Sequence, residues 1–303
     1  MSVKLINKKI LITGATGQVA LPVVEAFAKH NQVFALARFS NPDDESKVIQ
    51  LGAKLLKADL ASDDLTQIIP QDIDYVLNFA VLKTGDFDYD LAANAEGVGR
   101  LLVACQSVAA FIHFSSTAVY QYAGAEPRQE SSPLGDNHRH MFPTYSISKI
   151  AAETVARFTA KQFDIPLTIA RLSVPYGDNG GWPFWHLLMM KEGIPIDVHP
   201  DAPNTYNLLH TDDYIEKIPA LLEVATTATT TLNFGGSDPC SIEQWCEYIT
   251  ELTGFLPIYN STETAFGSLQ IDTTAMHKCI GKTKVDWKQG VLSMIKNLAP
   301  ELL

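Results

Sequence analysis

A tyrosine and a lysine stand four residues apart in the polar stretch PTYSISK, residues 143–149, directly before an apolar run. Apolar residues then recur at helical spacing, so we expect a helix that places Tyr145 and Lys149 one turn apart on one face. A phenol beside an ammonium is a pair that could carry out proton transfer. Taken alone, however, the pair is better explained by a tyrosine ring packed on a lysine stem, so the chemical interpretation depends on what surrounds it.

A glycine-rich loop, ITGATGQVA, follows the first predicted strand and opens a helix. Gly14 permits the tight turn, and Gly17 lets the backbone approach a pyrophosphate at the helix N-terminus. Ala20 stands where a third glycine is usual and is small enough for close packing of helix on strand. This context favours a dinucleotide-binding loop over a plain strand, turn and helix. Asp59, after another predicted strand, could bind an adenine amino group or be a solvent-facing loop residue.

The end of the second predicted strand bears on which dinucleotide binds. Enzymes that prefer NAD usually carry a carboxylate there for the ribose 2′-hydroxyl, whereas this chain has Arg38, in FALARFS. A guanidinium can bind a 2′-phosphate through paired hydrogen bonds, and a carboxylate would repel it. The sequence therefore favours NADP(H), with NAD(H) as the alternative and an ordinary surface charge as the other explanation of Arg38.

Composition limits the kind of partner. The chain of 303 residues is 46% hydrophobic and 19% charged, as is ordinary for a globular protein. Its formal net charge of −11 argues against nucleic acid or an anionic membrane surface as the main partner. Its apolar runs fall far short of a membrane span. Four cysteines at unrelated spacings indicate reduced thiols in a cytoplasmic protein with no metal site.

The elements that must position these residues alternate along the first half of the chain. Short apolar runs separated by amphipathic helices predict a parallel, doubly wound α/β sheet of the Rossmann type. We expect strands at 9–13, 32–37, 54–57, 75–79, 110–115 and 166–172, and helices at 18–29, 45–51, 65–69, 88–107 and 146–162. The last third, with helices near 240–253 and 290–298, predicts a smaller C-terminal substrate domain. The expected boundaries are 1–174 plus 206–236 for the dinucleotide-binding domain and 175–205 plus 237–303 for the substrate domain.

Further motifs follow these in a fixed order: ADL (58–60), NFAVLK (78–83), NAEGVGRLL (94–102), FSSTAVY (114–120), RLSVPYG (171–177), LLHTDDY (208–214) and NFGGS (233–237). On these stretches the chain resembles the extended short-chain dehydrogenases/reductases of the NAD(P)-dependent epimerase/dehydratase family, over nearly its whole length. The resemblance implies an NAD(P)-dependent enzyme with a small-molecule substrate. It also implies a homodimer formed through the predicted helices at 88–107 and 146–162.

The resemblance implies a role for each site residue. Tyr145 is the acid/base, Lys149 lowers its pKa and holds the nicotinamide ribose, and Ser116, with Thr117 as the alternative, polarises the substrate oxygen. Lowering a tyrosine pKa from ~10 to ~7 requires roughly 4 kcal/mol, and an ammonium about 4 Å away at an effective dielectric of ~20 attracts a phenolate by that order. The implied cofactor contacts are Gly14, Thr16, Gly17, Gln18, Val19, Arg38, Asp59, Leu60, Ala80, Lys83, Tyr145 and Lys149. Lys83 matches a lysine beside the cofactor in UDP-galactose 4-epimerases, with a solvated loop lysine as the alternative.

Three departures from the family pattern concern the substrate. Dehydratases of the family carry Asp-Glu where this chain has Thr117-Ala118, and sugar-nucleotide epimerases carry asparagine at the position of Val174. An arginine that clamps the nucleotide diphosphate is replaced by Tyr206 and Asn207. Because a diphosphate needs cationic partners, each departure weakens the nucleotide-sugar interpretation.

The presumed substrate region is aromatic instead. Trp182 and Trp185, in WPFWH, are predicted to contact an apolar or aromatic carbonyl substrate, or else to cap a helix end. The polar segment 124–141 is expected to be a mobile lid on which His138, Arg139 and His140 are solvated.

The sequence thus predicts an oxidoreductase that transfers hydride between nicotinamide and a carbonyl or secondary alcohol. The alternative is a nucleotide-sugar epimerase that retains NAD. A non-catalytic NADP-binding regulator is disfavoured, because the chain keeps Tyr145, Lys149 and the serine.

Overall fold

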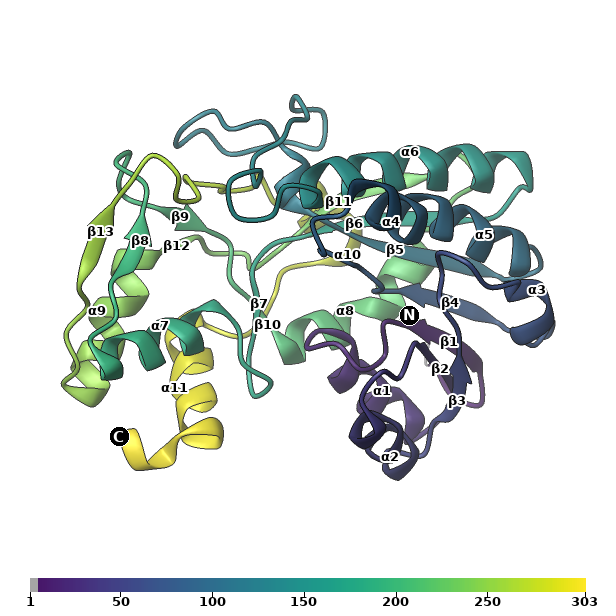
Figure 1. The fold of residues 1–303 in the computed structure, drawn as a ribbon, viewed down its shortest axis with the longest axis horizontal. Coiled ribbons are helices and arrows are strands. Elements are labelled where there is room, and N and C mark those ends of the chain that lie inside the picture. Colours follow the sequence, from purple (N-terminus) through teal and green to yellow (C-terminus); the bar gives the residue numbers. More distant parts are fainter. Residues whose placement is uncertain (1–4) are drawn as a thin grey trace.

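Seven parallel strands form the central sheet of the computed structural model, which describes residues 5–303 (Figure 1). In order across the sheet they are β11 (Thr230–Phe234), β6 (Leu167–Leu172), β5 (Ala110–Ser116), β4 (Tyr75–Asn78), β1 (Lys9–Thr13), β2 (Gln32–Ala37) and β3 (Lys54–Lys57). The chain moves outward in opposite directions from β1 and β4, so the order reverses between these two strands. In open α/β sheets the crevice beyond the carboxyl ends of such strands is where ligands bind.

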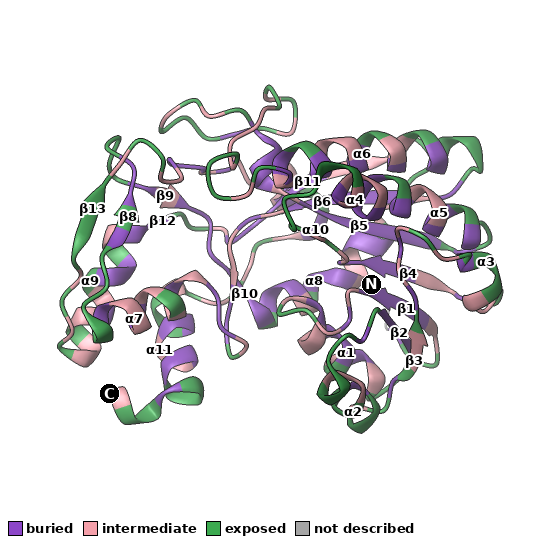
Figure 2. Cartoon of the chain, viewed as in Figure 1, coloured by how far each residue is buried: buried purple, intermediate pink, exposed green. Residues whose placement is uncertain are grey.

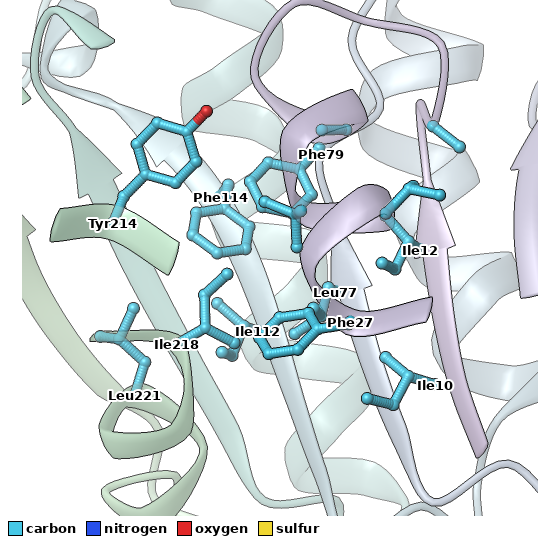
Figure 3. Packing of buried hydrophobic residues seen from close by; sticks show 14 of the residues in the cluster. Ile10, Ile12, Phe27, Leu77, Phe79, Ile112, Phe114, Tyr214, Ile218 and Leu221 are labelled. Carbon is cyan, nitrogen blue, oxygen red and sulfur yellow. The ribbon is translucent and has the colours of Figure 1, made fainter. Parts of the chain in front are cut away.

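Helices cover both faces of the sheet (Figure 1). One face carries α1 (Ala20–Ala28), α2 (Pro42–Gln50), α8 (Thr211–Glu223) and α10 (Thr274–Ile280), and the other carries α3 (Leu65–Ile68), α5 (Gly97–Ala104) and α6 (Tyr145–Gln162). Apolar side chains from both layers bury the central strands, which Figure 2 colours as buried, whereas the edge strand β3 has no buried residue. Near the crevice, Phe79 and Phe114 stack with their ring centroids 3.8 Å apart (Figure 3).

The helix predicted over 88–107 begins at Phe87 and ends at Ala104. It runs through α4 (Phe87–Leu91), one wide π-helical turn (Ala92–Glu96) and α5. Within the wide turn, Asn94 bonds both the amide and the carbonyl of Leu82, each at 2.7 Å, and donates to Ser148 at 3.0 Å. The turn therefore fastens the loop after β4 to α6, and π-helical turns of this kind often lie at functional sites.

The C-terminal part has its own apolar core and lies beside the sheet (Figure 1). It contains α7 (Trp182–Glu192), α9 (Ile242–Thr253), α11 (Trp287–Leu298) and the short 3-10 helix Pro300–Leu302. Three two-stranded ladders pair β7 (Pro175–Tyr176) with β10 (Leu209–His210), β9 (Thr205–Tyr206) with β12 (Cys240–Ser241), and β8 (Ile196–Val198) with β13 (Tyr259–Ser261). α10 packs on the sheet side, against β11 and α8. The proposed division into two domains stays a prediction.

The segment expected to be a mobile lid is fastened at its middle. Arg128 pairs with the chain near Ile271 through Arg128 N to Gln270 O and Asp272 N to Arg128 O, both 2.8 Å. The amide of Gly135 donates to Val119 O at 2.9 Å. A moving lid would therefore have to be the part after Gly135.

Candidate active site

The cofactor cavity opens between the ends of β1 and β4, with a volume of about 360 Å³. Gly14 has φ +64°, and a Cβ there would lie 2.9 Å from the Cα and N of Ala80, so only glycine fits. Within the described chain, no side chain caps the N-terminus of α1 and no acidic residue lies in its first turn. The positive end of the helix dipole suits a pyrophosphate. The residues present therefore fit a dinucleotide.

Seven of the expected cofactor contacts line this cavity: Gly14, Thr16, Gly17, Arg38, Asp59, Leu60 and Ala80. Arg38 is exposed, and its Nη1 donates to the Tyr89 hydroxyl at 3.0 Å, which in turn donates to Asp59 Oδ2 at 2.7 Å. Asp44, from the first turn of α2, also lines the cavity. Sequence reasoning missed Tyr89 and Asp44, because neither belongs to a motif.

The catalytic cavity, of about 410 Å³, adjoins the cofactor cavity, since Phe79 and Val81 line both. It brings together the other expected residues: Gln18, Val19, Lys83, Ser116, Thr117, Tyr145, Lys149, Trp182 and Trp185. None of the described residues that line it is an aspartate or a glutamate. Its cationic side chains are thus not neutralised by a carboxylate in the cavity wall.

Tyr145 is the first residue of α6, and Ser116 is the last residue of β5. The Ser116 Oγ accepts a hydrogen bond from the amide of Ala118 at 3.1 Å, which fixes its orientation at the strand end. Burial raises the pKa of Tyr145, and a hydrogen bond with Ser116 acts in the opposite direction. The phenol is therefore neutral and able to donate a proton.

Lys149 is buried one turn further along α6, and its Nζ donates to the carbonyl of Phe114 at 2.9 Å. Burial lowers the pKa of Lys149 to about 8; Glu153 opposes this shift and Lys83 adds to it. The structure differs here from the expected lowering of the Tyr145 pKa. Desolvation of the phenol outweighs the other influences on it, while the Lys149 ammonium bonds a backbone carbonyl.

Asp90, in α4, connects the loop that carries Lys83 to the start of α6. Its carboxylate accepts hydrogen bonds from the amide of Thr84 at 2.9 Å and the hydroxyl of Thr144 at 2.6 Å. Burial alone would raise the pKa of Asp90, but these hydrogen bonds lower it. Because Thr144 precedes Tyr145, Asp90 positions the tyrosine. No local pattern in the sequence indicates this role, since Thr144 is distant along the chain.

The expectation that His138 is solvated is wrong. Its ring stacks on Phe266 with 4.1 Å between centroids, and it lines the catalytic cavity. Burial, with the nearby charge of Lys83, lowers the pKa of His138 to about 4, so the ring is neutral near pH 7. Arg139 and His140 are exposed, as expected.

A model of the NAD dependent epimerase/dehydratase family matches residues 10–235. The chain belongs to this family. It is 27% identical over 238 residues to a trifunctional UDP-glucose 4,6-dehydratase, UDP-4-keto-6-deoxy-D-glucose 3,5-epimerase and UDP-4-keto-L-rhamnose reductase of Arabidopsis thaliana. The match covers 71% of this chain and 35% of that protein, so the chain spans about a third of the length of that relative.

Solved structures of epimerases share the fold of this chain. The UDP-glucuronic acid 4-epimerase of Bacillus cereus, in complex with UDP-glucuronic acid and NAD, aligns with a TM-score of 0.82 at 22% identity over 97% of this chain and 99% of that one. The UDP-glucose 4-epimerase of Thermotoga maritima, with UDP-glucose, aligns with a TM-score of 0.82 at 18% identity over 97% and 100%. The expected Rossmann-type fold and the expected family are thus confirmed.

Between residues 5 and 303, no helix is both long and apolar enough to cross a membrane. The same residues contain no cluster of three or more histidine, cysteine, aspartate or glutamate side chains arranged to hold a metal ion. All four cysteines are free, and three of them are buried.

Proposed function

We propose that this family member is an NADP(H)-dependent oxidoreductase that reduces a carbonyl compound or oxidises the matching alcohol. The observation that supports this most directly is that Ser116, Tyr145 and the buried Lys149 line one cavity, which adjoins the cofactor cavity. Bound nicotinamide would supply or accept the hydride. The proton is the part of the reaction that this chain's own residues supply.

In reduction, the Ser116 hydroxyl donates a hydrogen bond to the substrate oxygen, and the Tyr145 phenol delivers a proton as charge develops on that oxygen. The raised pKa of Tyr145 keeps the proton on the phenol until then. The ammonium of Lys149, one helical turn away, stabilises the phenolate that remains. In oxidation the same proton moves in the opposite direction.

Arg38 supports the choice of NADP(H), because it is the one cation among the described residues of the cofactor cavity. Asp44 opposes the choice of NADP(H), since its carboxylate lines the same cavity. The pairing of this carboxylate with Lys47, at 3.7 Å, neutralises its charge only partly. We propose that Arg38 outweighs Asp44, because its guanidinium can bond a 2′-phosphate directly.

The second candidate is a nucleotide-sugar epimerase that retains NAD, and the names of the relatives and structural neighbours support it. Dehydration has less support, because Thr117 and Ala118 provide neither a carboxylic acid nor a carboxylate. We also propose a homodimer through α5 and α6, whose outer surfaces expose Val103 and Phe158. A cytoplasmic location, inferred from the free cysteines, is likewise a proposal.

The test purifies the protein without added nucleotide and identifies any dinucleotide released on denaturation. An empty protein that binds NADPH more tightly than NADH supports the reductase, and stoichiometric NAD supports the epimerase. Tyr145→Phe should then abolish most turnover of a carbonyl substrate while NADPH binding persists. Full activity of this variant would contradict the assigned chemistry.

A further inference from the structure

A third cavity, of about 270 Å³, lies beside the catalytic cavity; we call it the side cavity. Trp182 and Trp185, in the first turn of α7, line both cavities. The Trp182 ring stacks on Phe266 with 5.6 Å between centroids and 4° between planes, and Phe266 also lines the side cavity. The two tryptophans therefore form the boundary across which a single ligand could reach both spaces.

The walls of the side cavity are apolar. Met141, Met189, Ile242 and Ala265 line it together with the aromatic rings. Methionine and aromatic walls adapt to flat apolar groups. An apolar cavity of ~150 Å³ is large enough to bind benzene, so the side cavity has room for one ring or two fused rings.

The charge that lines the side cavity would repel a phosphate. Among the described residues that line it, none is lysine or arginine, and the charged one is Asp197. His186 also lines it, but its Nδ1 accepts a hydrogen bond from Trp245 Nε1 at 2.9 Å, and burial lowers the pKa of His186 to about 4. The imidazole is therefore neutral near pH 7. A diphosphate placed here would meet a carboxylate and no cation.

We propose that the substrate has two parts: a carbonyl group that binds at Ser116 and Tyr145, and an uncharged apolar ring that passes Trp182 and Trp185 into the side cavity. This inference rests on the proposed function, and it adds the class of substrate. On this proposal, α7 and the loop around Phe266 determine specificity for the apolar ring of the substrate. A nucleotide diphosphate does not bind in the side cavity.

The experiment compares NADPH-dependent reduction of a short aliphatic ketone with that of the same ketone extended by a phenyl ring through a short alkyl chain. Burying a ring should raise kcat/KM about tenfold to a hundredfold, the range for burying a large apolar side chain. A phenyl phosphate analogue of the extended ketone should lose this gain because of Asp197. Asp197→Asn should restore part of it.

Met189→Trp, which narrows the side cavity, should remove the gain for the phenyl ketone and leave both the short ketone and the NADPH dissociation constant unchanged. Leu188→Trp is the matched control, because Leu188 is half-buried on α7, as Met189 is, but is not among the residues that line the cavity. Ala265→Leu narrows the same cavity from another segment and replaces Met189→Trp if that variant does not fold. Thermal melting reports folding of each variant.

Reduction of both ketones with equal kcat/KM would overturn the two-part substrate and leave the proposed function standing. Competitive inhibition by UDP that is relieved in the Met189→Trp variant would also overturn the two-part substrate, because a nucleotide would then occupy the side cavity. If neither ketone is reduced while NADPH binds, the proposed function and this inference both fail.

Discussion

Glu153 lies one helical turn after Lys149, and its side chain is fully buried between α6 and the sheet. Its Oε1 accepts from Arg171 Nε at 2.9 Å and from the Ser115 hydroxyl at 2.6 Å, and its Oε2 accepts from Arg171 Nη2 at 2.7 Å. The Arg171 side chain is 4% exposed. Burial opposes the charge of Arg171, but Glu153 outweighs it and raises the pKa of the guanidinium. Because Ser115 precedes Ser116, this ion pair fixes the catalytic end of β5 against α6.

Glu153→Gln keeps the shape of the side chain and removes its charge, which leaves Arg171 buried without a counterion. Removing one partner of a buried ion pair costs about 3–5 kcal/mol. Unfolding entropy is about 2.1 cal/mol/K per residue, which gives roughly 0.6 kcal/mol/K for a chain of 303 residues. The melting temperature should therefore fall by about 5–8 °C.

The assay is differential scanning calorimetry of the wild type, Glu153→Gln and Ser115→Ala. Ser115→Ala is the control, since it removes one hydrogen bond to the same carboxylate, worth about 1.5–3 kcal/mol, and keeps the ion pair. A Glu153→Gln protein that melts no lower than Ser115→Ala would refute the argument, because the buried ion pair would then add nothing beyond a single hydrogen bond to the carboxylate.

The same substitution should change the pH dependence of cofactor binding. Lys149, with a pKa of about 8, is charged below that pH and neutral above it. An anionic dinucleotide binds the charged form better, so NADPH affinity should fall as the pH rises through about 8. Glu153 raises the Lys149 pKa, so in Glu153→Gln the fall should occur at lower pH. Titrations of NADPH binding at a series of pH values measure this shift. A pH profile that is the same in Glu153→Gln and the wild type would show that Glu153 does not act on Lys149.

Three other substitutions test separate parts of the site. Arg38→Ala should weaken NADPH binding about tenfold to a hundredfold, the value of one charged hydrogen bond, and leave NADH unchanged in calorimetric titration; an equal loss for both would contradict its role. Lys83→Met removes a neighbouring charge that lowers the pKa of Lys149, so the pH profile of NADPH binding should move to higher pH. Asp90→Ala should reduce stability by about 1.5–3 kcal/mol in denaturant titration, because Thr84 and Thr144 lose a charged acceptor; an unchanged stability would mean that neither bond contributes.

Six strands of the sheet were predictable because they are short apolar runs between loops, and three of them, 9–13, 32–37 and 54–57, match the expected bounds. The edge strand β11 was not predicted. Among the described residues, three α-helices were not predicted. α7 carries apolar residues all round, so it shows no amphipathic period, and α8 contains Pro219 and is capped by the His210 side chain, which accepts from the amide of Asp212. Both features are atypical of helix signals. α10 is too short to show a period.

The site residues likewise divide into those that the sequence predicted and those that it did not. Residues in motifs, such as Ser116 and Lys149, were predicted and lie together in the catalytic cavity. The contacts of Glu153 and Asp90 and the packing of the half-buried His138 depend on partners far along the chain, which no local pattern records. Proximity of this kind follows only from the complete fold.

Two of the departures from the family pattern lie on one surface, the wall of the catalytic cavity. Val174 lines the catalytic cavity, and Tyr206 lines it too, with its ring edge-on to Trp182 at 5.3 Å. Asn207 bonds backbone instead, donating to Gly236 O at 2.8 Å and accepting from the amide of Ile271 at 2.9 Å. Polar groups that would bind a nucleotide sugar are thus replaced by apolar walls or used by the fold. Since Ser116, Tyr145 and Lys149 still line one cavity, this arrangement supports the proposed change of substrate over a loss of the chemistry.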